Sequence, residues 1–309
     1  MPLVIPHWQP QALLESLEFD WSRAAGIELA VLRLELIDPL ISGNKWFKLA
    51  PYLSAAAKAG FNGLISLGGP HSNHLHALAG AGKRFDFPVV GLLRGEPQDT
   101  PTVRDLQTMG MQLHWLGYGG YRARHQADFW LPWQQRYPHL FAVAEGGLGL
   151  LAAHSCASLR QQVQAQLDTL GWPDYDAWWL AAGTGTTAAG LVIAEAGEHP
   201  VYAALAVPAG HGTDRQIAAL LAEAGMANQG YHLVDACRGG FARVDPELLA
   251  FMSAAEQSSG VQFEPVYTAK ALLALRQHVE AGYFAPATRV LFVHTGGLQG
   301  RRALLSPLS

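Results

Sequence analysis

AWWLAAGTGTTAAG, residues 177–190, joins an apolar run to a turn rich in glycine and threonine and then to a segment of small residues. The apolar run predicts a buried strand over 177–180, and the small residues predict a helix over 187–196. Glycines let such a turn aim several backbone N–H groups at one point, and a helix N-terminus behind them favours a bound phosphate. The groups that would contact this phosphate are Gly183, Thr184, Gly185, Thr186 and Thr187.

Two nucleotide-binding motifs are excluded at this turn, whereas an ordinary capped turn stays open as an alternative. No lysine follows the glycines, as it would in a P-loop, and Ala188 stands where a dinucleotide-binding turn has its third glycine. A strand-to-helix turn with a threonine cap would give the same residues without any ligand.

The alternation of apolar runs with amphipathic segments continues through most of the chain. Further strands are expected at 63–67, 88–93, 112–116, 140–143, 201–207, 232–234 and 289–294. Helices are expected at 72–83, 102–109, 122–136, 214–224 and 269–281. Continuous apolar strands between helices are typical of parallel sheets with both faces covered, so the sequence predicts an α/β fold. Ligands of such sheets bind beyond the carboxyl ends of the strands, where the glycine-rich turns gather.

Composition favours a soluble enzyme of the cytoplasm. The chain has 309 residues, of which 50% are hydrophobic and 15% charged, which is the reverse of a disordered chain. A net charge of −4 gives no electrostatic case for nucleic acid or an acidic membrane surface. Two cysteines cannot form a disulfide framework, and we find neither a secretory signal nor an apolar stretch long enough to span a bilayer.

Two more segments carry candidate chemistry. SGNKWFKL, residues 42–49, places Lys45 and Lys48 at the start of a predicted helix. A lysine amine can form a Schiff base with an aldehyde when it is neutral, and the charge of Lys48 would lower the pKa of Lys45. GGPHSNHLH, residues 68–76, ends a strand, and Ser72 and Asn73 either cap the next helix or contact a ligand. Its three histidines do not predict a metal site, because His76 faces away from His74 on a helix and no acidic or cysteine ligand is near.

Four motifs in this order resemble one family. They are Gly-Asn-Lys at 43–45, Gly-Gly-x-x-Ser-Asn at 68–73, Gly-Thr-Gly-Thr-Thr at 183–187 and His-Thr-Gly-Gly at 294–297. The chain is similar, over about residues 30–300, to the 1-aminocyclopropane-1-carboxylate deaminase and D-cysteine desulfhydrase family. Those are pyridoxal-phosphate enzymes of the tryptophan synthase β-like fold, known as fold type II. The resemblance implies two lobes: a large cofactor-binding domain from residues 1–49 and 147–309, and a small α/β domain from residues 50–146.

The resemblance also implies roles for single residues. Lys45 would carry pyridoxal phosphate, and Asn73 would bind the 3-hydroxyl of the cofactor. Ser72 would sit beside the substrate carboxylate or act as an acid–base or nucleophilic group. The turn 183–187 would hold the phosphate, in agreement with the interpretation from the residues alone. Tyr267 would stack near the pyridine ring, and Thr295 would face its nitrogen.

Thr268 and Thr295 are the expected determinants of substrate choice. In the cyclopropane-opening deaminases these positions hold an acidic residue and a leucine, and in the D-cysteine desulfhydrases both are threonine. The resemblance therefore implies β-elimination from a small amino acid such as D-cysteine, giving a 2-oxo acid and ammonia. A cyclopropane-opening deaminase, a racemase or dehydratase on the same scaffold, and a non-catalytic phosphate binder remain alternatives. The family also suggests a homodimer.

Overall fold

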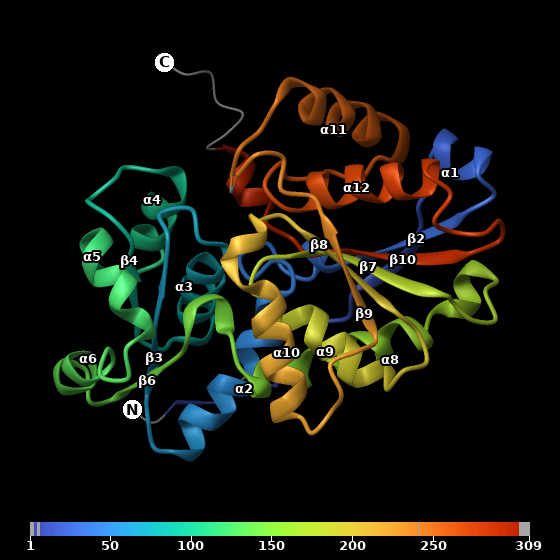
Figure 1. Ribbon diagram of the computed structural model, residues 1–309. Coiled ribbons are helices and arrows are strands. Elements are labelled where there is room, and N and C mark those ends of the chain that lie inside the picture. The colour runs from blue at the N-terminus through green and yellow to red at the C-terminus, as the bar shows by residue number, and fades with distance from the viewer. Residues whose placement is uncertain (1–2, 5–6, 241, 303–309) are drawn as a thin grey trace.

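The computed structural model describes residues 3–4, 7–240 and 242–302, and these form two sheets with helices on their faces (Figure 1). The larger sheet has six strands in the order β1-β2-β10-β7-β8-β9. Their bounds are Leu13–Ser16, Glu28–Arg33, Arg289–His294, Ala177–Ala182, Val201–Leu205 and Tyr231–Asp235. Strand β1 pairs antiparallel with β2, and every other pair in this sheet is parallel.

The smaller sheet has four parallel strands in the order β5-β4-β3-β6. Their bounds are Gln112–Trp115, Val89–Leu93, Gly63–Gly68 and Leu140–Ala142. All eight strands expected from the sequence are present, so the prediction of parallel sheets in an α/β fold is confirmed. The antiparallel β1 and its neighbour β2 were not predicted.

Helices cover both faces of each sheet. On the large sheet, α11 (Pro246–Ser259) and α12 (Thr268–Glu280) lie over one face. The opposite face carries α8 (Ser158–Gln164), α9 (Thr186–Glu195) and α10 (Thr213–Glu223) (Figure 1). Around the small sheet are α2 (Lys45–Lys58), α3 (Asn73–Phe85), α4 (Pro101–Thr108), α5 (Gly117–Arg122) and α6 (Leu131–Arg136). The remaining two are α1 (Asp20–Ala24) and α7 (Leu150–Cys156).

Two adjacent tryptophans of β7 show how the large sheet is buried. Trp178 packs into the apolar cluster on the side of α8 and α9, and Trp179 packs into the cluster on the side of α12. Successive side chains of a strand point to opposite faces, so both faces of β7 are covered. Each indole N–H is satisfied, by Glu195 Oε1 at 2.6 Å and by Ala271 O at 2.8 Å.

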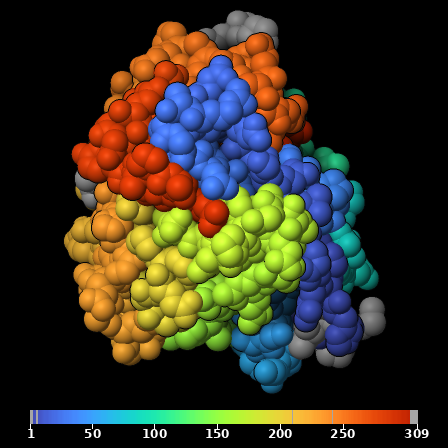
Figure 2. All heavy atoms as spheres, turned by 90° about the vertical axis from the view of Figure 1, so that its right-hand side faces the viewer, coloured from blue at the N-terminus to red at the C-terminus, as the bar shows by residue number. Residues whose placement is uncertain are grey.

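Parallel pairing brings a segment near the start of the sequence beside one near its end. Strand β10 pairs in parallel with β2, and the residue before β10 bonds to the first residue of β2, where Glu28 N donates to Thr288 O at 3.0 Å. Figure 2 shows this side of the molecule, with the N-terminal blue region against the red region near the C-terminus. The segment that follows β2 therefore lies close to the segment that follows β10.

The single helix expected at 122–136 was wrong. The chain there forms the end of α5, a 3₁₀ turn over Ala123–His125, and α6, which begins at Leu131. Pro132 lies in the first turn of α6. A proline is accepted there but interrupts a longer helix, because it has no N–H to donate. The expected boundary after residue 49 falls inside α2, and the domain boundaries stay a prediction.

No helix among the described residues is long and apolar enough to cross a membrane. The cytoplasmic location and the homodimer also stay predictions.

Candidate active site

Lys45 begins α2, and its side chain is tied to the turn after β7 through its neighbour Asn44. Lys45 Nζ donates to Asn44 Oδ1 at 2.5 Å, and Asn44 Nδ2 donates to Thr187 Oγ1 at 2.8 Å. Burial, helped by the positive charge of Lys48, lowers the pKa of Lys45 to about 7. A large fraction of this amine is therefore neutral near neutral pH, as reaction with an aldehyde requires.

Lys48 lies one helical turn further and reaches the same turn after β7. Its Nζ donates to Gly146 O at 3.0 Å and to Thr184 Oγ1 at 3.2 Å. Burial lowers its pKa to about 8. Sequence reasoning gave Lys48 only an effect on Lys45 and found no basic residue within 183–187. The structure thus adds a cation to the expected phosphate seat, from a residue 136 positions away in sequence.

The turn from Gly183 to Thr187, called the phosphate turn below, has the geometry of an anion-binding site. Gly185 has a φ of +74°, and a Cβ there would lie 2.5 Å from Ile217 Cγ1, so glycine is required. The hydroxyls of Thr184 and Thr186 lie 3.1 Å apart at the N-terminus of α9. A helix N-terminus, two hydroxyls and the Lys48 ammonium together fit a phosphate dianion.

Thr295 follows β10 and lies against the loop that precedes Lys45. Asn44 N donates to Thr295 O at 3.1 Å, and a Cβ on Gly43 would lie 2.2 Å from that same oxygen. A Cβ on Gly296 would lie 2.5 Å from Gly43 Cα. The two backbones therefore touch, and this contact fixes Thr295 near Lys45.

Ser72 and Asn73 lie at the start of α3, on the side of the small sheet. Ser72 Oγ accepts from Leu75 N at 3.1 Å, so this serine caps the helix. Asn73 Oδ1 accepts from Gln299 Nε2 at 2.8 Å. The start of α3 therefore contacts the segment after β10, and the Asn73 amide keeps N–H donors for other partners.

Tyr267 and Thr268 lie at the start of α12. Tyr267 Cε1 is 3.3 Å from the point where a Cβ on Gly183 would lie, so the ring packs on the phosphate turn. Burial, followed by the charge of Glu264, raises the pKa of this tyrosine. The Thr268 hydroxyl accepts from Glu264 N at 2.9 Å and contacts Glu264 O at 3.2 Å. Thr268 therefore uses its hydroxyl within its own turn, as a cap would.

The Glu264 carboxylate is a buried acidic group that sequence reasoning did not single out. It accepts backbone N–H groups from Val266, Tyr267 and Thr268 at 2.6–2.8 Å. Glu264 begins the turn Glu-Pro-Val-Tyr that leads into α12, and this position could have been noticed as a possible helix cap.

Two of the three histidines within residues 71–76 contact different partners. His74 Nε2 contacts Ser66 Oγ at 2.8 Å, whereas His76 Nε2 contacts Asp105 Oδ2 at 3.2 Å. Burial lowers the pKa of His74 to about 3, helped by the charges of Lys48 and Lys45, so His74 is neutral.

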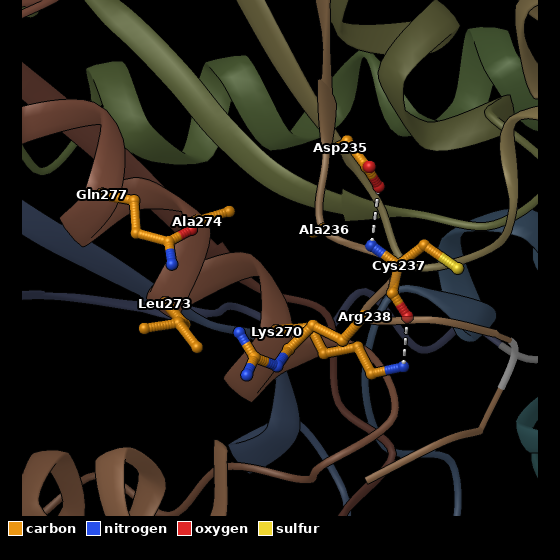
Figure 3. A pocket seen from close by; sticks show the side chains of 8 residues that line it. All are labelled: Asp235, Ala236, Cys237, Arg238, Lys270, Leu273, Ala274 and Gln277. Carbon is orange, nitrogen blue, oxygen red and sulfur yellow. Dashed lines mark hydrogen bonds between the residues drawn. The ribbon is translucent and has the colours of Figure 1, made fainter. Parts of the chain in front are cut away.

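A cavity of about 160 Å³ at the end of β9 lies apart from these residues (Figure 3). It is lined by Asp235, Ala236, Cys237, Arg238, Lys270, Leu273, Ala274 and Gln277. The buried Lys270 amine donates to Cys237 O at 3.1 Å, as drawn in Figure 3, and to Gly240 O at 3.2 Å. None of the residues expected to form the active site lines this cavity.

Known proteins resemble this chain over most of its length. A protein of Pyrococcus furiosus with the curated name "Putative 1-aminocyclopropane-1-carboxylate deaminase" is 26% identical over 297 residues, covering 90% of this chain and 87% of its own. A protein of the same name from Thermotoga maritima is 28% identical over 292 residues, covering 90% of this chain and 91% of its own.

Solved structures share the fold. The crystal structure of an ACC deaminase homologue has a TM-score of 0.83 at 22% identity, with 97% of this chain and 92% of that chain covered. The crystal structure of serine racemase from Dictyostelium discoideum has a TM-score of 0.66 at 15% identity, with 93% of this chain and 92% of that chain covered. These likenesses confirm the tryptophan synthase β-like fold.

A family model described as "Pyridoxal-phosphate dependent enzyme" matches residues 5–296. That range includes Lys45, the phosphate turn and Thr295, which the structure brings together, so the residues present fit this cofactor. The expectation of pyridoxal phosphate is confirmed, and the chain belongs to the family of pyridoxal-phosphate dependent enzymes.

Proposed function

We propose that this enzyme is a lyase that removes a leaving group from the β-carbon of a small amino acid, with D-cysteine as the preferred substrate. The observation that carries the proposal is the Lys45 amine, with a pKa of about 7, bonded to Asn44, which itself bonds to the turn 183–187 and to the backbone of Thr295. Elimination from D-cysteine consumes water and yields pyruvate, hydrogen sulfide and ammonia.

The cofactor, when bound, withdraws electrons from the α-carbon of the amino acid. Lys45 would accept the α-proton of the substrate as a neutral amine. Lys48 and the hydroxyls of Thr184 and Thr186 would hold the cofactor phosphate. The Asn73 amide would donate to the 3-oxygen of the cofactor, and Ser72 with the start of α3 would receive the substrate carboxylate. Tyr267 would lie against the pyridine ring.

Thr295 supports elimination over ring opening. Its hydroxyl can hydrogen-bond the pyridine nitrogen but supplies no charge to keep a proton there. Loss of a thiolate from an amino acid that has an α-proton needs less electron withdrawal than opening a ring that has none. Thr268 contributes less to this argument than its sequence position suggested, because its hydroxyl is bonded to Glu264.

Cyclopropane opening is the second candidate, and one observation favours it besides the names of the curated relatives. The Glu264 carboxylate is buried close enough to Lys45 to oppose the lowering of the lysine pKa. Opening of the cyclopropane ring would use an acidic group in the active site, and Glu264 is such a group. Racemisation begins with the same α-proton removal and stays a third outcome of the assay.

The test is a panel of D-cysteine, β-chloro-D-alanine, L-cysteine, D- and L-serine and 1-aminocyclopropane-1-carboxylate, assayed for 2-oxo acid release and for racemisation. Lys45→Ala is the control for cofactor-dependent turnover. We expect the two β-substituted D-amino acids to react fastest, and borohydride reduction to label Lys45 and not Lys48. Faster turnover of the cyclopropane substrate would replace the proposal by its second candidate, and a label on Lys48 would overturn the assignment of the lysine.

A further inference from the structure

A buried pair of ionisable side chains lies next to Thr295 and has no part in the chemistry above. His294, the last residue of β10, places its Nδ1 3.0 Å from Glu35 Oε2. Glu35 belongs to a 3₁₀ turn, Leu34–Leu36, that directly follows β2. The side chains are 0% and 1% exposed, so solvent does not screen their contact.

The partners of the two ring nitrogens of His294 indicate that a hydrogen lies between Nδ1 and Glu35 Oε2. His294 Nε2 lies 2.8 Å from Gln262 O, and a carbonyl oxygen only accepts, so Nε2 carries a hydrogen. If Nδ1 carried none, its lone pair would face an anionic carboxylate oxygen. Among the described residues Glu35 Oε2 has no hydrogen-bond partner apart from this contact. Gly296 N also donates toward Nδ1 at the longer distance of 3.3 Å, and this is the bond that a neutral ring would keep.

The charges around the pair balance when the shared proton is on His294. Arg33 contacts both Glu35 and Glu15, so one cation faces two carboxylates. A protonated His294 makes this group of four side chains neutral. Burial alone would raise the pKa of Glu35, but His294 and Arg33 outweigh burial and hold it low. The buried Glu264 also lies close to His294; burial raises the pKa of Glu264, and its backbone hydrogen bonds and the charge of His294 oppose that rise.

The pair joins the two segments that set the distance between Lys45 and Thr295. Gly43 N donates to Leu34 O at 2.9 Å and Ser42 Oγ donates to Glu35 O at 3.2 Å, so the loop before Lys45 is anchored on the 3₁₀ turn. We propose that Glu35 and a protonated His294 form a buried ion pair that positions Thr295 relative to Lys45. Both are positioning residues, since neither touches the reacting atoms.

The protonation state is tested on the full-length protein with its cofactor, labelled with ¹⁵N-histidine. At pH 7 the His294 ring should show hydrogens on both nitrogens, with its signals assigned by their loss in His294→Asn. In Glu35→Gln the ring should become neutral. A bare Nδ1 in the unmodified protein, accepting only from Gly296 N, would overturn the ion pair. This readout needs no substrate, so it decides the ion pair even if the proposed function fails.

The positioning role rests on the proposed function, because it is read from turnover of the best substrate in the panel. His294→Asn and Glu35→Gln should each lower kcat about tenfold and leave KM within about twofold, and the double variant should be no slower than about the slower single variant. His199→Asn is the matched control, since its Nδ1 lies 2.8 Å from the buried Glu195 at the far end of α9. It should leave kcat unchanged.

Unchanged kcat in a folded His294→Asn or Glu35→Gln would overturn the positioning role, and so would an equal loss in His199→Asn. If one of the two variants fails to fold, the other decides the role.

Discussion

Replacing Lys48 by methionine should raise the pKa of Lys45, because the two ammonium groups lie one turn apart on α2. The pKa of Lys45 falls from 10.5 to about 7, with burial as the largest cause and the charge of Lys48 next. Residues three apart on a helix have Cβ atoms about 5–6 Å apart. At such a distance two unit charges repel by about 0.7–3.3 kcal/mol for effective dielectric constants between about 80 and about 20. One pKa unit corresponds to about 1.4 kcal/mol, so removal of the charge should raise the pKa of Lys45 by about one unit, to about 8.

The assay uses cofactor-free protein and follows the rate at which a small acylating reagent modifies Lys45, by peptide mass spectrometry across pH. Lys48→Arg keeps the charge and should keep the pKa near its original value. Lys58→Met removes a charge from the exposed end of the same helix and should have no effect. An unchanged pKa of Lys45 in Lys48→Met, or an equal rise in Lys58→Met, would refute the electrostatic coupling.

Three further predictions concern the loop before Lys45 and the pair beside Thr295. Gly43→Ala should lower the free energy of unfolding, measured by urea titration, by more than about 2 kcal/mol, because its Cβ would lie 2.2 Å from Thr295 O. Gly60→Ala is the control: Gly60 has the same φ of +80° but nothing within 4 Å of its Cβ position, so the loss there should be about 1 kcal/mol. Asn44→Ala loses its bonds to Lys45 and Thr187 and should weaken cofactor affinity about tenfold in an absorbance titration, and unchanged affinity would contradict the bridging role. The folded-state pKa of Glu35 is lowered, so its charge stabilises the fold above the unfolded value of about 4.3, and this contribution is lost as pH falls through the lower folded value. The difference in Tm between the unmodified protein and Glu35→Gln should therefore shrink between about pH 7 and about pH 3, and a constant difference would contradict the prediction.

The fold was predictable because most strands are apolar runs bounded by glycines or turns. Strand β7 is an apolar run that ends at a glycine turn, and β3 is bounded in the same way by Gly63 and Gly68. Strand β2 lacks a glycine turn after it and runs straight into a 3₁₀ turn, so nothing in the local pattern separates it from its surroundings. The helix expected at 122–136 is broken, and Pro132 was the local signal against a continuous helix there.

The composition of the candidate site was predictable, but its contacts were not. Motifs gave Lys45, the phosphate turn and Thr295 from resemblance, and each motif is local in sequence. The bond between Lys48 and Thr184 joins residues 136 apart, and the pairing of Glu35 with His294 depends on β10 lying beside β2. Such contacts follow from strand order, which no single segment encodes.

Glycines of the motifs make this convergence possible by allowing backbones to touch. A Cβ on Gly296 would strike Gly43 Cα at 2.5 Å, and a Cβ on Gly297 would lie 2.7 Å from Asn73 Nδ2. These two glycines let the segment after β10 touch both the loop of Lys45 and the start of α3, which belongs to the other sheet. The carboxyl ends of parallel strands already share one edge of each sheet, and the close contacts bring the two edges together. Packing around the segment after β10 therefore requires part of what identifies the family, the Gly-Gly after His-Thr.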